Sequence, residues 1–191
     1  MTSKIILIGG NGYIGRSLTS AWAAIDPSAK FYVLSRSGHN QLEMPQIMNS
    51  AIDINDREAV SAEIPDQIDY IVDLVGRPEK DAATSIEVND KPALLMKFLA
   101  ETHYAKAMGF IGGRLGAKAF VTTKRTLIGQ LQASSVPLAV VEPTLVYGAD
   151  RQDSMTKMVP LLKIFGAVFP NMKPVKVETV VDELLTKLLQ Y

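Results

Sequence analysis

The sequence contains no cysteine, which excludes disulfide bonds, thiolate catalysis and the cysteine-built zinc and iron–sulfur centres. It has only two histidines, His39 and His103, and we therefore expect no bound metal. The 191 residues carry 20 basic and 20 acidic side chains. Because nucleic-acid binders usually need a surplus of basic residues to displace counterions from phosphates, we expect no nucleic-acid partner.

Long hydrophobic runs are also missing, although 47% of the residues are hydrophobic, as in ordinary globular proteins. The first apolar run, Ile5–Ile8, ends in glycines and is too short for a signal peptide or a membrane-spanning helix. We therefore expect a cytoplasmic protein without a membrane span. No repeat or linker divides the chain, which favours a single domain over residues 1–191 with a short C-terminal segment at about 149–191.

Short runs rich in β-branched residues alternate with longer stretches of helical periodicity. The expected strands are Ile5–Ile8, Phe31–Leu34, one within Ile47–Ile54, Tyr70–Val75, Met108–Ile111 and Leu138–Val141. Right-handed crossovers turn such units into an α/β fold with a Rossmann-type, doubly wound, mostly parallel sheet and helices on both faces. Ligands of this fold bind at the carboxyl ends of the strands.

Apolar residues at helical spacing predict the helices between these strands. The first helix presents Ile14, Leu18, Ala21 and Ile25, a later one presents Phe120, Lys124, Leu127 and Leu131, and the terminal one presents Val180, Val181, Leu184, Leu185, Leu188 and Leu189. Between Ala82 and Glu101, Pro92 marks a kink, a break or the first turn of a second part. Residues 148–153 are predicted to be a loop, 155–165 a helix, and 170–176 irregular or a short strand.

A glycine-rich turn directly follows the first strand. It reads Gly9-Gly10-Asn11-Gly12-Tyr13-Ile14-Gly15 and contains the G-x-G-x-x-G spacing. Glycine allows the tight turn, the approach of a pyrophosphate to bare amides and the close packing of helix on strand. A purely structural glycine turn is the alternative, but the position inside a βαβ unit favours a nicotinamide dinucleotide held at the start of the helix.

The end of the second strand favours NADP(H), with NAD as the alternative. An acidic residue about 20 positions after the glycines would bind the ribose hydroxyls of NAD, and the sequence has none there. It has Ser35 and Arg36 instead, which could receive a 2′-phosphate together with Arg16, or could simply be solvated. Asp53, at the end of the third strand, either orients near the adenine or caps the following helix.

Taken together, these motifs resemble those of extended or atypical short-chain dehydrogenases/reductases, the grouping of the NAD-dependent epimerase/dehydratase and NmrA-like families. The matching segments are Ile8–Gly15, Asp53, Asp73–Arg77, Val88-Asn89, Glu142–Gly148 and Pro174–Glu183. The resemblance implies that Ile54, Val75, Gly76, Lys124 and Pro143 join the glycine turn in binding the cofactor. The stretch Leu74–Arg77 is also similar to the NADPH-binding accessory subunit of respiratory complex I.

The chain departs from this grouping at its catalytic Y-x-x-x-K motif, where Phe120 stands at the tyrosine position and Lys124 is retained. Phenylalanine has no proton to transfer, and the fifth strand ends in Gly112 and Gly113 where relatives carry a serine. We therefore expect an NADP(H)-binding protein with weak, altered or absent oxidoreductase activity and a regulatory role. The alternative is an active reductase or epimerase on a small carbonyl or sugar-nucleotide substrate, with oligomeric state left open. The candidate replacement acids are Tyr147, Thr122, Thr123, Asp73 and Tyr104.

Overall fold

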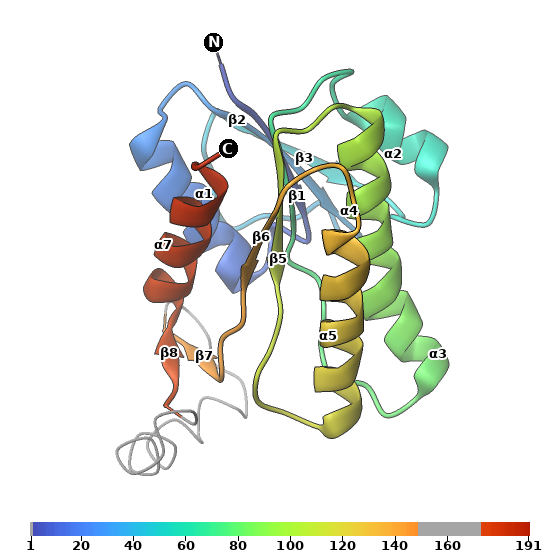
Figure 1. Cartoon of the computed structure of the whole chain (residues 1–191). Coiled ribbons are helices and arrows are strands. Elements are labelled where there is room, and N and C mark those ends of the chain that lie inside the picture. The colour runs from blue at the N-terminus through green and yellow to red at the C-terminus, as the bar shows by residue number, and fades with distance from the viewer. Residues whose placement is uncertain (1, 149–172) are drawn as a thin grey trace.

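The structure, a computed structural model, describes residues 2–148 and 173–191 and contains one six-stranded parallel sheet (Figure 1). Its strands are β1 (Lys4–Ile8), β2 (Lys30–Ser35), β3 (Ile47–Ala51), β4 (Tyr70–Asp73), β5 (Ala107–Ile111) and β6 (Leu138–Val141). Their order is β3-β2-β1-β4-β5-β6, the doubly wound order of a dinucleotide-binding sheet. The predicted fold class is confirmed. The helix predicted at 155–165 and most of the loop predicted at 148–153 lie outside the described residues.

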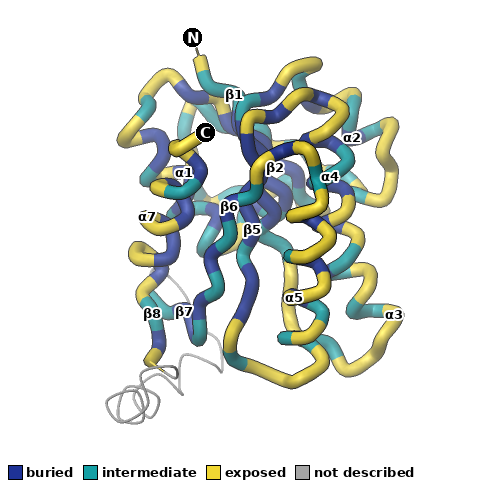
Figure 2. Tube along the Cα trace, in the orientation of Figure 1, coloured by how far each residue is buried: buried dark blue, intermediate teal, exposed yellow. Residues whose placement is uncertain are grey.

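Alternating side chains of the central strands build two cores, one on each face of the sheet. In β1, Ile5 and Leu7 point to one face while Ile6 and Ile8 point to the other, and all four are fully buried. The first face is covered by α1 (Tyr13–Ile25) and α7 (Val177–Leu188). The second face is covered by α2 (Arg57–Glu63), α4 (Lys91–Thr102) and α5 (Lys118–Gln132). Figures 1 and 2 show the buried sheet between these layers.

The segment between β4 and β5 contains three helical elements of two kinds, α and π. It begins with α3 (Ala82–Ser85), continues through the π-helical turn η1 (Ile86–Asp90) and ends with α4. Pro92 lies in the first turn of α4, where a missing backbone N–H costs least. Of the three predicted roles of Pro92, the first turn of a second part is therefore the one observed.

The predicted inner faces of two helices are wrong at their last residues. Ile25 is 61% exposed because α1 ends there, and Trp22 fills the core instead by packing against Phe31 and Tyr70 with ring centroids 6.4 and 5.1 Å apart. Leu189 is 43% exposed because it follows the last helical residue of α7. The helical spacing of apolar residues continues through both residues, but neither side chain reaches the core that the rest of its helix packs against.

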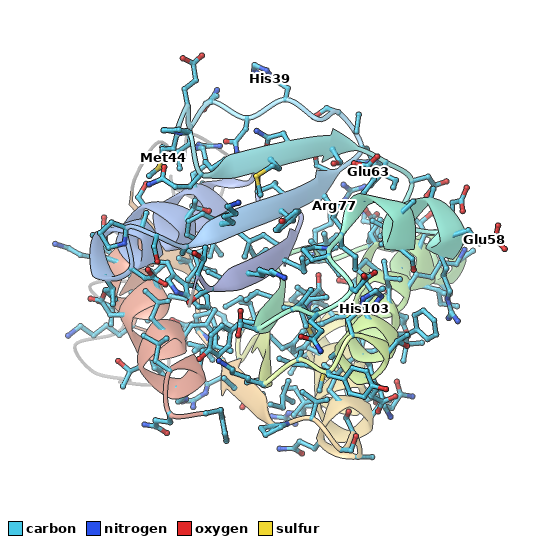
Figure 3. The ribbon with its side chains drawn as sticks, turned by 90° about the horizontal axis from the view of Figure 1, so that it is seen from above. His39, Met44, Glu58, Glu63, Arg77 and His103 are labelled. Carbon is cyan, nitrogen blue, oxygen red and sulfur yellow. The ribbon has the colours of Figure 1, made fainter. Side chains whose placement is uncertain are left out.

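Two short strands lie beside the main sheet. β7 (Val146–Tyr147) and β8 (Val175–Lys176) pair in parallel, so the segment predicted to be irregular or a short strand contains a strand. The two histidines are far apart in Figure 3, where His39 projects beyond the sheet edge and His103 lies on the α4 side. His103 Nδ1 lies 3.1 Å from the Pro65 carbonyl oxygen, a structural contact.

We predict that Leu184→Ala destabilises the fold by about 2–5 kcal/mol, because it empties a fully buried position in α7. Leu189→Ala is the matched control, with an expected change within about 0.5 kcal/mol, since its side chain is largely exposed. Urea denaturation followed by circular dichroism measures both changes. Equal losses for the two variants would contradict the assigned core.

Candidate functional site

A cavity of about 430 Å³ opens at the carboxyl ends of the first four strands. β1 pairs with β2 on one side and β4 on the other, so the connections after β1 and after β4 diverge and leave a crevice between them. The predicted cofactor residues that line this cavity are Gly9, Asn11, Gly12, Ser35, Arg36, Asp53, Ile54, Val75 and Gly76. The sheet topology thus brings together residues from four separate connections.

Packing within the chain requires some of the glycines after β1. Gly9 has φ +75°, and a Cβ placed there would lie 2.5 Å from Val75 Cγ2. A Cβ at Gly15 would lie 2.3 Å from the Gly10 carbonyl oxygen. Both positions therefore need glycine to let α1 and the β4 loop approach the turn.

Gly12 is different, because the chain itself has room for a side chain there. A Cβ at Gly12 would meet only the Gly9 carbonyl oxygen, at an ordinary 3.5 Å, and its φ of −69° suits any residue. Gly12 is the N-cap of α1, a position at which Ser, Asp and Asn stabilise a helix. Glycine has no side chain that could make this capping hydrogen bond. It leaves bare backbone facing the cavity at a helix N-terminus, where anions bind favourably.

Polar groups of the turn and of β2 meet at one side of the cavity. Asn11 Nδ2 donates to Ser35 Oγ at 2.6 Å, and the Gly38 N–H donates to the same oxygen at 3.1 Å. Since Ser35 Oγ accepts two hydrogen bonds, its own hydrogen can point into the cavity. Asn11 Oδ1 is buried and has no hydrogen-bond partner within residues 2–148 and 173–191, and Arg36 is exposed on the cavity wall. This side of the cavity offers donors suited to an anionic group.

Five other predicted residues occupy positions away from that cavity. Arg16 donates from Nη1 to the Asn11 carbonyl oxygen at 2.7 Å, and with Tyr13 it lines a separate cavity beside Glu178. Pro143 lines a third cavity of about 480 Å³, formed by the end of β6 with β7, β8 and α7. Ile14 and Gly15 lie in the first turn of α1.

Asp53 does not cap α2. That cap is Asp56, whose Oδ1 accepts from the Ala59 N–H at 3.0 Å. Asp53 Oδ1 instead accepts from the backbone and side-chain nitrogens of Asn55 at 3.0 and 2.8 Å. The capping alternative for Asp53 is wrong because Asp56 directly precedes the helix, and Asp53 is left on the cavity wall.

Lys124 lies under the floor of the cavity rather than on its wall. Its side chain is only 3% exposed, and its Nζ donates to the Val75 carbonyl oxygen at 3.4 Å. A Cβ at Gly76 would lie 2.6 Å from Lys124 Nζ and 2.9 Å from Asn89 Oδ1, so the ammonium group packs against Gly76, which itself lines the cavity. The Phe110 ring centroid is 4.5 Å from Nζ.

Asn89, in η1, holds the loop after β4 in place. Its side-chain oxygen accepts from the Arg77 N–H at 3.1 Å, and its side-chain nitrogen donates to the Arg77 carbonyl oxygen at 3.0 Å. This amide makes a pair of hydrogen bonds like that between neighbouring strands, although it comes from a helix. The family resemblance pointed to Asn89, and the structure gives it a positioning contact beside Gly76.

Asp73 and Lys124 are two buried charges in this region. Asp73 Oδ1 accepts from the Val75 N–H at 2.9 Å, while Oδ2 is buried with no hydrogen-bond partner in the described part of the chain. Burial raises the pKa of Asp73 to about 6, against the opposing effect of the Lys124 charge. Burial lowers the pKa of Lys124, and the carboxylates of Asp73 and Asp90 oppose that shift.

The structure separates the candidate replacement acids. Tyr104 follows α4 at the opposite, amino-terminal edge of the sheet, and it is 79% exposed. Thr122 is an exposed residue of α5, Thr123 is half-buried beside it, and Asp73 is too deeply buried to contact a substrate. Tyr147 lies at the carboxyl edge in the cavity that contains Pro143. Tyr147 is therefore the best placed of the five.

Phe120 packs over the glycines that follow β5. A Cβ at Gly113 would lie 3.3 Å from Phe120 Cε1, and one at Gly116 would lie 3.5 Å from Cδ1. The Phe120 ring centroid is 5.9 Å from Lys124 Nζ. The ring thus keeps its place beside the lysine but brings no proton donor.

Seven further residues line the cavity and were missing from the predicted set. They are Ile8, Leu34, Ser37, Asn55, Arg77, Glu87 and Val88. Most lie within four residues of a strand end, so the rule that ligands bind beyond the strand ends could have found them. Glu87 and Val88 come from η1, which reaches the cavity only through folding of the α3–α4 segment.

Residues 2–148 and 173–191 contain no group of three His, Asp or Glu residues that could hold a metal ion. Within the same described residues, no helix is long and apolar enough to cross a membrane.

The model of the NAD dependent epimerase/dehydratase family matches residues 5–110. WbmH of Bordetella bronchiseptica, solved in complex with NAD+, is 13% identical with a TM-score of 0.73, and the match covers 98% of this chain and 72% of WbmH. UDP-glucose 4-epimerase is 15% identical with a TM-score of 0.72, and the match covers 98% and 73% of the two chains. Such low identities show a shared fold. No curated protein sequence matches the chain.

ElxO with NADP bound is another structural neighbour, at 14% identity and a TM-score of 0.74, and the match covers 98% of this chain and 92% of ElxO. A tyrosine-to-phenylalanine variant of ElxO with NADPH bound matches with 16% identity and a TM-score of 0.73, covering 98% and 92% of the two chains.

We predict that Asp73 makes the stability of the fold depend on pH. Because its folded pKa of about 6 exceeds the ordinary value of 3.8, its contribution is fully present below pH 3.8 and is lost as the pH rises through 6. The unfolding free energy of the wild type, relative to that of Asp73→Asn, should therefore fall by about 3 kcal/mol between pH 3 and 7. Urea denaturation across this range measures the difference. If the difference in unfolding free energy between the two proteins does not change with pH, the pKa of Asp73 is not raised in the folded state.

Proposed function

Because the chain belongs to the NAD dependent epimerase/dehydratase family, we propose that it binds NADP(H) and has weak, altered or absent oxidoreductase activity. The observation that carries the proposal is Gly12, a bare N-cap that the packing of the chain does not require and that faces a 430 Å³ cavity. A side chain there would help the helix but obstruct a pyrophosphate. The absence of one is most simply explained by a bound diphosphate.

The choice of NADP(H) over NAD rests on the end of β2. Ser35 and Arg36 offer a hydroxyl and a guanidinium on the cavity wall, and neither is acidic. A guanidinium can bind a phosphate through two charge-assisted hydrogen bonds, whereas a ribose hydroxyl gains little from it. Neighbours of the same fold are solved with either NAD+ or NADP(H), so the fold itself is compatible with both.

In this proposal each part of the cofactor contacts a different strand end. Gly9, Asn11, Gly12 and the first turn of α1 hold the diphosphate, and Ser35 with Arg36 holds the 2′-phosphate. Asp53 and Ile54 contact the adenine, while Val75, Gly76, Lys124 and Pro143 contact the nicotinamide half. Arg16 would assist only by fixing Asn11, whose carbonyl oxygen accepts its hydrogen bond. Bound NADPH would supply hydride chemistry.

The proposed lack of efficient turnover follows from the groups around Lys124. Phe120 brings no ionisable proton, and the loop 112–117 contains no serine or threonine. A missing general acid typically lowers a rate by about 100-fold to 10,000-fold, without preventing cofactor binding. The ElxO variant shows that, in that protein, a tyrosine-to-phenylalanine replacement is compatible with bound NADPH. We therefore infer a binding protein with a regulatory role that responds to the cofactor.

An active reductase or epimerase is the second candidate, and the position of Tyr147 favours it. Its phenol lies in a 480 Å³ cavity together with Pro143, Thr144 and Glu142, at the carboxyl edge where a substrate would meet the nicotinamide. Small carbonyl compounds or sugar nucleotides would be the substrate class. Tyr147 would then act as the proton donor in place of Phe120.

We predict that Arg36→Ala weakens NADPH binding by about 10-fold to 100-fold, the usual range for a charge-assisted hydrogen bond to phosphate. NADH binding should change less than about twofold, because NADH lacks the 2′-phosphate. Isothermal titration of both cofactors against wild type and variant measures the two affinities. Equal weakening of NADPH and NADH would show that Arg36 does not contact that phosphate.

Gly12→Asp is the control for binding at the turn itself. Its carboxylate should abolish binding of both cofactors through repulsion of the diphosphate, while an aspartate N-cap keeps α1 stable. A fully folded Gly12→Asp protein that still binds NADPH would overturn the proposed function.

We predict that Phe120→Tyr raises the turnover of a carbonyl substrate by roughly 100-fold over wild type, because it restores a phenol beside Lys124. A panel of aldehydes and ketones, followed by NADPH absorbance, measures this change. Tyr147→Phe tests the second candidate, an active enzyme in which Tyr147 is the proton donor. Vigorous wild-type turnover that is lost in Tyr147→Phe would establish an active enzyme and contradict the proposed catalytic gap.

A further inference from the structure

One buried carboxylate near the cavity has no role in the site described so far. Asp73 ends β4 with only 1% of its surface exposed, between Ile8 of β1 and Phe110 of β5. Its Oδ2 has no hydrogen-bond partner among the residues that the structure describes. An orphaned buried carboxylate oxygen is costly, and it persists only where the surrounding structure or a function compensates for it.

The compensating charge is the ammonium group of Lys124. That group lies between the rings of Phe110 and Phe120, at 4.5 and 5.9 Å from their centroids, and its one described hydrogen bond, to the Val75 carbonyl oxygen, is long at 3.4 Å. A lysine so enclosed by apolar groups tends to lose its proton unless a negative charge lies nearby. Asp73 is the more deeply buried of the two carboxylates that act on it.

Other charged groups are few around this lysine. Two carboxylates act on it electrostatically, Asp73 from β4 and the half-buried Asp90 from η1. β5 contributes Phe110, and α5 itself contributes Phe120. Among residues 2–148 and 173–191, Lys124 is the one charged group that acts on Asp73. The two buried charges therefore depend chiefly on each other.

We infer that Asp73 is a positioning residue that acts through Lys124: its carboxylate keeps the ammonium group charged and in place beneath Gly76, ready for the nicotinamide ribose. The inference rests on the proposed function for the identity of the ligand. It adds a residue that never touches the cofactor yet determines whether Lys124 can donate charge-assisted hydrogen bonds to it.

The inference makes cofactor affinity depend on the protonation of Asp73. When Asp73 takes up a proton, Lys124 loses its main counter-charge and its ammonium form becomes less favourable. Because burial raises the pKa of Asp73 to about 6, this change falls within a range that is easily tested. NADP+ suits the test because it withstands mild acid.

The first measurement uses the protein without cofactor. The ¹³Cε signal of Lys124, assigned with Lys124→Met, should shift in a step near pH 6 as Asp73 titrates. The step should vanish in Asp73→Asn, which keeps the acceptor for the Val75 N–H, and should persist in Asp90→Asn. No variant is needed to see the wild-type step, and its absence would overturn the inference.

The second measurement is the affinity for NADP+ between pH 5 and 8. We expect Asp73→Asn to weaken binding about tenfold at pH 7.5, the difference between a charged and a neutral donor, and Asp90→Asn to weaken it less than about twofold. Protonation of NADP+ itself changes the affinity of every variant equally, so it cancels when a variant is compared with wild type at the same pH. The relative loss in Asp73→Asn should shrink toward pH 5, where the wild-type carboxylate is already neutral.

A double-mutant cycle tests whether Asp73 acts through Lys124. Lys124→Met should weaken NADP+ binding, and adding Asp73→Asn to it should cause no further loss. Additive losses would overturn the inference, as would unchanged affinity in Asp73→Asn. If wild type fails to bind NADP+ at all, the proposed function fails, and the apo titration alone then decides whether Asp73 controls the charge of Lys124.

Discussion

The close packing between the end of β1 and the start of α1 is the constraint on which the rest of the site depends. Gly9 takes a left-handed conformation against Val75, and Gly15 lies so near the Gly10 carbonyl that no side chain fits. These contacts fix the angle at which α1 leaves the sheet and the separation of the β1 and β4 loops. Once they are set, Gly12 has to face the crevice, and the loops after β2 and β3 complete its wall. The cavity is therefore a consequence of backbone packing, and few side chains are needed to shape it.

A second constraint acts beneath the cavity, where the sheet is apolar but carries Asp73 at the end of β4. The strand pairs Asp73 with Ile8 on one side and Phe110 on the other, so its carboxylate has almost no access to water. Burial of this kind usually destabilises a fold unless the charge is matched. Lys124, from α5, supplies that match, and both side chains hydrogen-bond to the backbone of Val75. The fold therefore tolerates two buried charges where an apolar pair would pack more simply, which is common at functional sites.

Much of this architecture could be predicted from local sequence, and the failures have physical causes. Apolar and β-branched runs located all six strands of the main sheet, with Leu138–Val141 matched at both ends. The signal is strongest in the central strands β1 and β4, which are buried on both faces and therefore almost wholly apolar. The faces of α1 and α7 were wrong at Ile25 and Leu189, since periodicity does not reveal where a helix leaves the packing surface. The π-helical turn and the placement of Lys124 near Asp73 depend on contacts between distant segments. No local pattern encodes these contacts, and Asp56 rather than Asp53 capped α2 for the simpler reason of its adjacency to the helix.

Around Lys124, the motif residues that this chain shares with short-chain dehydrogenases/reductases have a different role from those that it lacks. Those retained, the glycine turn, Asn89 and the lysine, shape or hold a binding surface and work through hydrogen bonds and fixed charge. Those lost, a phenol at position 120 and a hydroxyl after β5, would move a proton during a reaction. Binding a dinucleotide needs the first group only, because its free energy comes from a preorganised surface rather than from a reacting acid. Under the proposed function, a chain with the first group and without the second senses or stores a cofactor more than it turns it over.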